Sequence, residues 1–188
     1  MRTNTDAEQQ YNILLTVGTT QFPYLTSLFL SPSNLLSLLS SFPHKHISCT
    51  IQHGTEPFKT LDSTLKNSLL KNNWSHKATT PSPTTYLLKG LGSSNTRLLT
   101  LNFLPYLTPL PLSTSSLILT HAGAGTLLEI IPLLSLQIIV VPNRSLMDDH
   151  QTEIADAIKE EVLVHDGGDI LRYDLVGDGE RREGVVGG

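Results

Sequence analysis

Three short apolar runs constrain the fold of this chain more than any other feature of its sequence. They are NILLTVG at 12–18, SLILT at 116–120 and LQIIVVP at 136–142, and each ends in a glycine, a threonine or a proline. An uninterrupted apolar run of this length, bounded by turn residues, is typical of a strand that is buried on both faces of a parallel sheet. Because such a sheet needs helices on both faces, these runs predict an α/β fold.

The remaining segments also alternate between predicted strands and predicted helices. KHISCTIQ at 45–52 and LLTLNF at 98–103 predict two more strands, which gives a five-stranded, Rossmann-like parallel sheet. A helical stretch is expected at 57–70. Residues 24–42 are leucine-rich at helical spacing but contain Pro32, so they predict one broken helix or two short ones.

A further helix is predicted from Ser145 to about residue 161, because apolar residues recur there at intervals of three and four. Ser145 and Asp148 form a capping-box pattern at its start. On this helix Gln151 falls on the inward apolar stripe and His150 flanks it. Both side chains are candidates for a ligand site, and the alternative is that they bond neighbouring loop groups.

With 188 residues the chain predicts one domain. We expect an N-terminal extension at 1–11, a folded domain at 12–165 and a mobile, glycine-rich and charged tail at 166–188. Residues 71–97 are rich in Asn, Ser, Thr, Pro and Gly without a sustained period, and they predict an irregular insertion in the domain.

Charge is unevenly distributed along the chain. Residues 9–128 carry seven Lys or Arg against two acids, whereas 129–188 carry thirteen acids against five basic side chains. The basic part is too poor in arginine and in interleaved aromatic residues to indicate nucleic-acid binding. A mildly basic face toward a phosphorylated ligand or an anionic membrane surface remains open.

The chain itself predicts a soluble protein of a reducing compartment. Its first ten residues lack the apolar core of a secretory leader. The longest apolar stretch, 127–142, is interrupted by polar residues and proline and is shorter than the roughly 20 residues of a membrane-spanning helix. Cys49 is the single cysteine, so no disulfide framework is expected.

The decapeptide THAGAGTLLE at 120–129 follows one of the apolar runs and predicts a strand, a glycine turn and a helix. This arrangement places backbone N–H groups at the carboxyl edge of the sheet, where they suit a phosphate. Gly123 and Gly125 allow a tight turn and the close approach of a ligand. The alternative is that Thr126 and Glu129 form only a capping box.

The first apolar run ends in a second donor-rich turn. Gly18 and Thr19 offer N–H and hydroxyl groups at the same edge of the sheet. A dinucleotide site is less well supported, because Leu128 stands where the third glycine would be. A metal site made of His121, His150 and Asp148 lacks a closely spaced ligand pair.

Read in order, VGTT, IQHGT, HAGAGTLLE and IIVVPNRSLMDDHQTEIA give the chain a resemblance to a known family. It resembles the catalytic subunit of the eukaryotic UDP-N-acetylglucosamine transferase that adds the second GlcNAc to dolichol-diphosphate-GlcNAc. That family is similar to the C-terminal, donor-binding half of the bacterial N-acetylglucosaminyltransferase that makes lipid II.

The resemblance implies one donor-binding half of a GT-B-type glycosyltransferase with an inverting mechanism. It implies that the chain binds UDP-GlcNAc without a metal or other cofactor, while a membrane-anchored partner subunit holds the dolichol-linked acceptor. It further implies a heterodimer at the cytosolic face of the endoplasmic reticulum, with the chain also in the cytoplasm. The alternative function is a non-catalytic nucleotide-sugar-binding or regulatory module.

The family pattern also implies roles for particular residues. Glu129 would bind the ribose hydroxyls, Gln151 the sugar hydroxyls, and Thr126 with the glycine turn the diphosphate. The candidate substrate-binding residues are Gly18, Thr19, Gly123, Ala124, Gly125, Thr126, Glu129, Asn143, His150 and Gln151. His121 is the only candidate in this chain for the general base, which the partner can also supply.

The chain departs from the family pattern at several positions. Phe22 is followed by Pro23 where the family commonly has an acid after the aromatic residue, Thr126 replaces serine, and Asp149 replaces asparagine. Pro132 lies within the helix expected after the glycine turn, so it must shorten or kink that helix.

Overall fold

The computed structural model describes residues 10–19, 21–41, 46–71, 75–79, 85–89, 98–104, 109–133, 136–145 and 150–165. Among these residues, six strands lie side by side and parallel. In spatial order they are β5 (Leu98–Leu104), β2 (His46–Gln52), β1 (Tyr11–Thr16), β6 (Leu117–Thr120), β7 (Gln137–Val140) and β8 (Leu163–Val164). The predicted α/β class and parallel sheet are confirmed.

The sheet is larger than the sequence predicted. Two strands, β3 (Ser75–Thr79) and β4 (Thr85–Lys89), form an antiparallel pair, and β4 pairs antiparallel with β5. The segment 71–97 is therefore not irregular throughout, and that prediction was wrong. These short segments carry no sustained period, and pairing with β5 decides their conformation more than their composition does. The two-residue β8 is likewise too short to show a pattern.

The order of the strands creates a switch point between β1 and β6. From β1 the chain passes to β2 and then to β3 at the far edge, and it comes back through β4 to β5 beside β2. It then crosses to the other side of β1 at β6 and continues to β7 and β8. Thr16 at the end of β1 pairs with Thr120 at the end of β6, so the two carboxyl ends are level. Open α/β sheets bind their ligands in the crevice at such a point.

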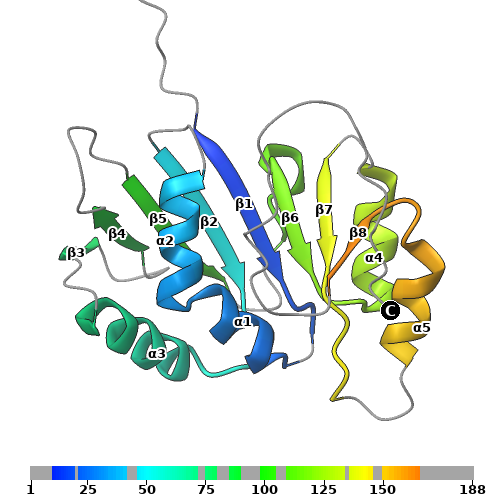
Figure 1. Cartoon of the computed structure of the whole chain (residues 1–188), viewed down its shortest axis with the longest axis horizontal. Coiled ribbons are helices and arrows are strands. Elements are labelled where there is room, and N and C mark those ends of the chain that lie inside the picture. Colours follow the sequence, from blue (N-terminus) through cyan, green and yellow to red (C-terminus); the bar gives the residue numbers. More distant parts are fainter. Residues whose placement is uncertain are drawn as a thin grey trace, which may run out of the picture.

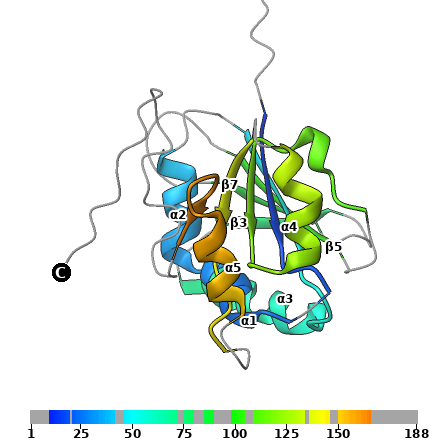
Figure 2. The ribbon, with the colours of Figure 1, turned by 90° about the vertical axis from the view of Figure 1, so that its right-hand side faces the viewer.

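The two faces of the sheet carry separate hydrophobic cores. Along β1, Ile13 and Leu15 face one core and Leu14 faces the other, as the alternation of a strand requires. The first core includes residues of α1 (Pro23–Phe29), α2 (Pro32–Ser41) and α3 (Phe58–Lys71). The second includes residues of α4 (Ala124–Ile130) and α5 (His150–Ile158). Figure 1 shows the two groups of helices at opposite ends of the sheet, and Figure 2 shows α2 and α4 on opposite sides of it.

Prolines end two helices, as the sequence predicted. α1 ends at Phe29 and α2 begins at Pro32, which confirms two short helices. α4 ends at Ile130, and a 3₁₀ turn, Ile131–Leu133, contains Pro132. Because proline has no N–H to donate to the preceding turn, the regular helix cannot continue through it.

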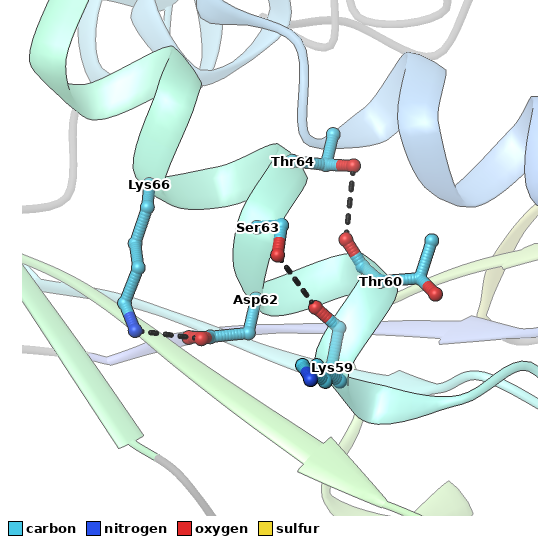
Figure 3. A network of polar contacts seen from close by, with 6 residues as sticks. All are labelled: Lys59, Thr60, Asp62, Ser63, Thr64 and Lys66. Atoms are coloured by element: carbon cyan, nitrogen blue, oxygen red, sulfur yellow. Dashed lines mark hydrogen bonds and ion pairs between the residues drawn. The ribbon is translucent and has the colours of Figure 1, made fainter.

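The outward side of α3 is an ordinary solvated helix face (Figure 3). Lys66 Nζ lies 2.6 Å from Asp62 Oδ2, an ion pair between residues four apart. The hydroxyls of Ser63 and Thr64 donate to carbonyls one turn back, over 2.9 and 3.1 Å. These polar side chains satisfy one another and their own helix, so this face does not compete with the sheet edge as a candidate site.

The start of α5 differs from the prediction. Ser145 lies in a turn, where its N–H and its hydroxyl donate to Asn143 Oδ1 over 3.1 and 2.6 Å. This is an Asx turn, and it occupies the hydroxyl that we expected to cap the helix. The predicted capping partner Asp148, the neighbouring Asp149 and the predicted tail at 166–188 lie outside the described residues. In the part of the chain that the structure describes, every helix is too short or too polar to cross a bilayer.

Candidate functional site

The turns that follow β1 and β6 meet at the switch point. Gly18 has a φ of 61°, a backbone conformation that favours glycine. A Cβ atom at Gly18 would lie 2.8 Å from Thr126 Oγ1 and 3.0 Å from His121 Cε1. The first turn therefore packs directly against the residues that follow β6. The structure thus brings Gly18 together with His121 and Thr126, all three predicted as site residues.

Two buried residues that the sequence analysis did not identify hold the Gly18 turn. Thr16 Oγ1 accepts the Gly18 N–H over 3.2 Å and donates its own proton to Gln52 Oε1. Thr16 is fully buried and Gln52 nearly so. Their signal in the sequence is a polar residue at the end of an otherwise apolar strand, a position where burial requires a hydrogen-bond partner.

The two glycines of the turn after β6, Gly123 and Gly125, have different surroundings. A Cβ atom at Gly123 would lie 2.1 Å from His121 Nε2, so the imidazole ring itself requires glycine there. Around Gly125, by contrast, no atom of the described residues beyond its chain neighbours and its own helix backbone lies within 4 Å of the position of a Cβ. The sequence predicts turn geometry and ligand approach as the reason for both glycines. The structure assigns Gly123 to internal packing and leaves open space at Gly125.

The first turn of α4 has unused hydrogen-bond donors. The first bond of the helix runs from the Leu127 N–H to the Gly123 carbonyl over 3.0 Å, and no side chain caps the helix. The N–H groups of residues 124–126 precede that bond and have no partner within the helix. Gly123, and not Thr126, is the N-cap residue. The alternative reading of Thr126 and Glu129 as a capping box is therefore wrong.

Thr126 and Glu129 lie three residues apart on α4, which places them on the same side of the helix. Thr126 is half-buried with its hydroxyl beside Gly18, and Glu129 is exposed to solvent. A carboxylate one turn away from a cluster of N–H donors can bind hydroxyl groups of a molecule whose anionic part lies on those donors.

A third turn, after β7, lies beside the second one. The Val141 N–H donates to the Thr120 carbonyl over 2.8 Å. Gln151 is buried, which confirms its predicted inward position, and its Oε1 accepts the Asn143 N–H over 2.9 Å. The amide oxygen of Gln151 thus serves the loop. Its Nε2 group has no hydrogen bond to another described residue.

His150 is placed differently from the other candidates. It is the first residue of α5, its side chain is 72% exposed, and its Nδ1 lies 3.5 Å from Glu153 Oε2. Within the described ranges, no three His, Cys, Asp or Glu side chains come close enough to hold a metal ion. Asp148, which completes the metal set considered from the sequence, lies outside those ranges.

His121 is buried between the turns, with 3% of its surface exposed. Its Nδ1 atom has no hydrogen-bond partner among the described residues. Burial lowers the pKa of His121 to about 4, and an interaction with the backbone of Thr16 opposes this shift in part. The ring is therefore neutral near pH 7. Its role as a general base stays a prediction.

The part of the sequence that contains these turns matches a known protein family. Residues 12–167 match the Glycosyltransferase family 28 C-terminal domain. The chain belongs to this family. A curated relative, the UDP-N-acetylglucosamine transferase subunit ALG13 of Cryptococcus neoformans var. neoformans serotype D (strain JEC21 / ATCC MYA-565), is 31% identical over 160 residues, which cover 82% of this chain and 76% of the relative. The protein of the same name from strain B-3501A matches equally well.

Solved structures show the same fold. The NMR solution structure of ALG13 superposes with a TM-score of 0.55 and 20% identity, covering 84% of this chain and 78% of that chain. The crystal structure of Acinetobacter baumannii MurG gives the same TM-score and identity, and the match covers 85% of this chain but 37% of MurG. The predicted fold, a single Rossmann-like half of a GT-B-type glycosyltransferase, is confirmed.

The burial of His121 predicts a pH-dependent stability. The unfolded chain takes up a proton on this residue near pH 6.5, whereas the folded chain does so only near pH 4. The free energy of unfolding is therefore unaffected above about pH 6.5, falls as the pH is lowered toward 4 and levels off below. The full loss from this group is on the order of 3 kcal/mol. Urea unfolding of the wild type and of His121→Gln at pH 7, 5.5 and 4 measures it.

The variant should lose less stability than the wild type across this interval, because glutamine does not titrate. The difference between the two proteins removes the contribution of the other histidines and of the carboxylates. Parallel curves for the two proteins would contradict the account of a buried, neutral ring.

Proposed function

We propose that this chain is the donor-binding subunit of a glycosyltransferase that transfers GlcNAc from UDP-GlcNAc to GlcNAc-diphosphodolichol. One observation carries the proposal. The uncapped N–H groups of residues 124–126 adjoin open space at Gly125, beside the Gly18 turn and at the switch point of the sheet. Membership of the family 28 C-terminal domain and the name of the ALG13 relatives support it.

The diphosphate of the donor would lie between the two glycine turns. The N–H groups of residues 124–126 and the Thr126 hydroxyl would bind it from one side, with Gly18 and Thr19 on the other. Thr16 and Gln52 keep the first turn in place before any ligand arrives. Because these donors are already oriented, they need no reorganisation when charge develops on the leaving group.

The remaining candidates would bind the two ends of the nucleotide sugar. Glu129, one turn along α4, would accept hydrogen bonds from the ribose hydroxyls. Gln151 would donate from Nε2 to the GlcNAc hydroxyls, while its Oε1 accepts a hydrogen bond from the Asn143 N–H. His150 would reach the same ligand only at its solvent-exposed edge.

The reaction that we propose is an inverting displacement. A hydroxyl of the acceptor sugar attacks the anomeric carbon, the bond to UDP breaks, and the negative charge moves onto the diphosphate. The fixed N–H donors of the glycine turn would stabilise that charge, and holding the donor in one geometry lowers the entropic cost of the attack. A base must take the proton of the attacking hydroxyl. This base is either His121, the only candidate within this chain, or a group of the partner subunit.

The partner in this proposal is a membrane-anchored subunit that binds the acceptor. A single α/β domain of this family supplies one wall of a cleft, and the match with 37% of MurG agrees with one half of a two-domain enzyme. A lipid-linked acceptor requires that the complex work at a membrane. The proposed location is the cytosolic face of the endoplasmic reticulum, with the chain recruited there by its partner from the cytoplasm.

Gly125→Ala should raise the stability of the free chain and lower its affinity for the ligand. Within the described ranges, no residue beyond its chain neighbours and its own helix contacts a methyl group at this position, and alanine favours a helix over glycine by about 1 kcal/mol. The free chain should therefore become more stable by up to that amount. The same methyl group would enter the space assigned to the diphosphate and weaken UDP-GlcNAc binding by about tenfold or more, the effect of about 1.4 kcal/mol. Thermal unfolding and calorimetric titration measure the two effects. Unchanged affinity would remove Gly125 from the site.

Glu129→Ala should lower the affinity for UDP-GlcNAc without changing the fold. An exposed carboxylate contributes little to stability, so the loss would come from its hydrogen bonds to the ligand, on the order of 1.5–3 kcal/mol. Glu160→Ala, which removes an exposed carboxylate after the end of α5, is the matched control and should bind like the wild type. Equal affinities of the two variants in a titration would refute the assignment of Glu129.

Co-expression with the membrane-anchored partner tests the reaction itself. The complex should transfer GlcNAc from UDP-GlcNAc to a GlcNAc-diphospholipid acceptor, detected as a disaccharide-lipid by mass spectrometry. If the complex forms and binds UDP-GlcNAc without making this product, the chain is the non-catalytic binding module instead. A chain whose melting temperature rises with NAD but not with UDP would contradict both functions.

A further inference from the structure

The His121 side chain lies against both Gly18 and Gly123. A Cβ atom at Gly123 would lie 2.1, 2.7 and 2.9 Å from three atoms of the His121 ring, and one at Gly18 would lie 3.0 Å from its Cε1 atom. These two glycines belong to turns that follow different, neighbouring strands. The His121 ring therefore lies between the two turns, and Gly123 cannot be enlarged without moving it, whereas a Cβ at Gly18 would meet the Thr126 hydroxyl first and the ring next.

Burial of the His121 ring carries a free-energy cost that an apolar side chain would avoid. With 3% of its surface exposed, the side chain leaves its Nδ1 atom without a hydrogen bond of normal geometry to the part of the chain that the structure describes. A buried polar atom without a partner costs about 1–3 kcal/mol, and an apolar side chain of similar size would fill the same space without it. A feature that costs stability beside a ligand site points to a role in the function of that site.

We propose that His121 is a positioning residue whose ring sets the separation between the turns after β1 and β6. By doing so, it fixes the distance between the donors of residues 18–19 and those of residues 124–126. The inference rests on the proposed function, in which these two sets of donors bind one diphosphate. A displacement of about 1 Å at such a site is enough to lower activity about a hundredfold.

The contact between His121 and Gly123 can be tested without backbone strain. Gly123 has φ −81° and ψ 122°, values that alanine adopts as readily as glycine. The three atoms nearest to the added methyl group in Gly123→Ala all belong to the ring. In Gly123→Ala the ring must move, whereas in His121→Ala/Gly123→Ala the methyl group enters space that the missing ring has vacated.

The experiment is a double-mutant cycle on the full chain, with the affinity for UDP measured by calorimetry. Gly123→Ala should weaken UDP binding about tenfold in the presence of His121 and less than about twofold in the His121→Ala background. His121→Ala alone should weaken binding about tenfold, because the turns lose their spacer. His121→Ser, whose side chain lacks all the ring atoms that approach residue 123, repeats the cycle if His121→Ala does not fold.

His53→Ala is the matched control. His53 is a second buried histidine, it follows β2 at the same edge of the sheet, and its Nδ1 lies 2.7 Å from the Glu56 carbonyl. In the His53→Ala background, Gly123→Ala should still cost about tenfold in affinity. An equal factor in all three backgrounds would overturn the proposal, and so would wild-type affinity in His121→Ala.

A second readout separates this proposal from the proposed function. If the wild-type chain binds no UDP, the proposed function fails, and the unfolding free energies of the same variants then decide the spacer role. Destabilisation by Gly123→Ala that disappears in the His121→Ala background supports the spacer. Additive destabilisation would overturn it.

Discussion

The parallel pairing of β1 with β6 is the constraint on which the rest of the site depends. It places Thr16 and Thr120 at the same level, so the turns that follow begin side by side. The strands β2 to β5 lie on the β1 side of this pair, and β7 and β8 lie on the β6 side. Neither neighbouring crossover therefore covers the crevice between the two strand ends. The third turn joins them because Val141 donates to the Thr120 carbonyl. Three loops that are far apart in the sequence thus meet at one edge.

Buried polar contacts fix the conformations of these loops. Thr16 and Gln52 hold the Gly18 turn, and Gln151 holds the backbone of Asn143, whose side chain in turn bonds Ser145. Each bond lies within the protein, so it exists before a ligand is bound. A site whose donors are oriented in advance avoids the cost of ordering them during binding. The neutral ring of His121 fits this scheme as a part of the frame.

The sequence was sufficient for the fold because the strands of the sheet centre are continuous apolar runs. Burial on both faces leaves NILLTVG and LQIIVVP few other conformations. Pro32 and Pro132 marked helix ends for an equally local reason, since the missing N–H acts wherever the residue stands. The hairpin of β3 and β4 escaped prediction because its stability comes from pairing with β5, a contact between segments distant along the chain.

The candidate site was predictable as a location but not as a set of contacts. The glycine turns at 18 and 123–125 were visible in the sequence, whereas the reason for each glycine was not. That Gly123 accommodates His121, while Gly125 borders open space, follows only from the positions of atoms in different turns. The same holds for Ser145, whose expected capping role was replaced by its bond to the Asn143 side chain.

The central claim is that the turns after β1 and β6 form one nucleotide-sugar site. Backbone amide NMR spectra of the full chain, recorded during titration with UDP-GlcNAc, test it most directly, because they report each N–H group separately. The account predicts that the largest shifts occur together at Gly18, Thr19 and residues 124–126, with one common saturation curve. Shifts confined to only one of the two turns, or shifts centred on another edge of the sheet, would contradict it.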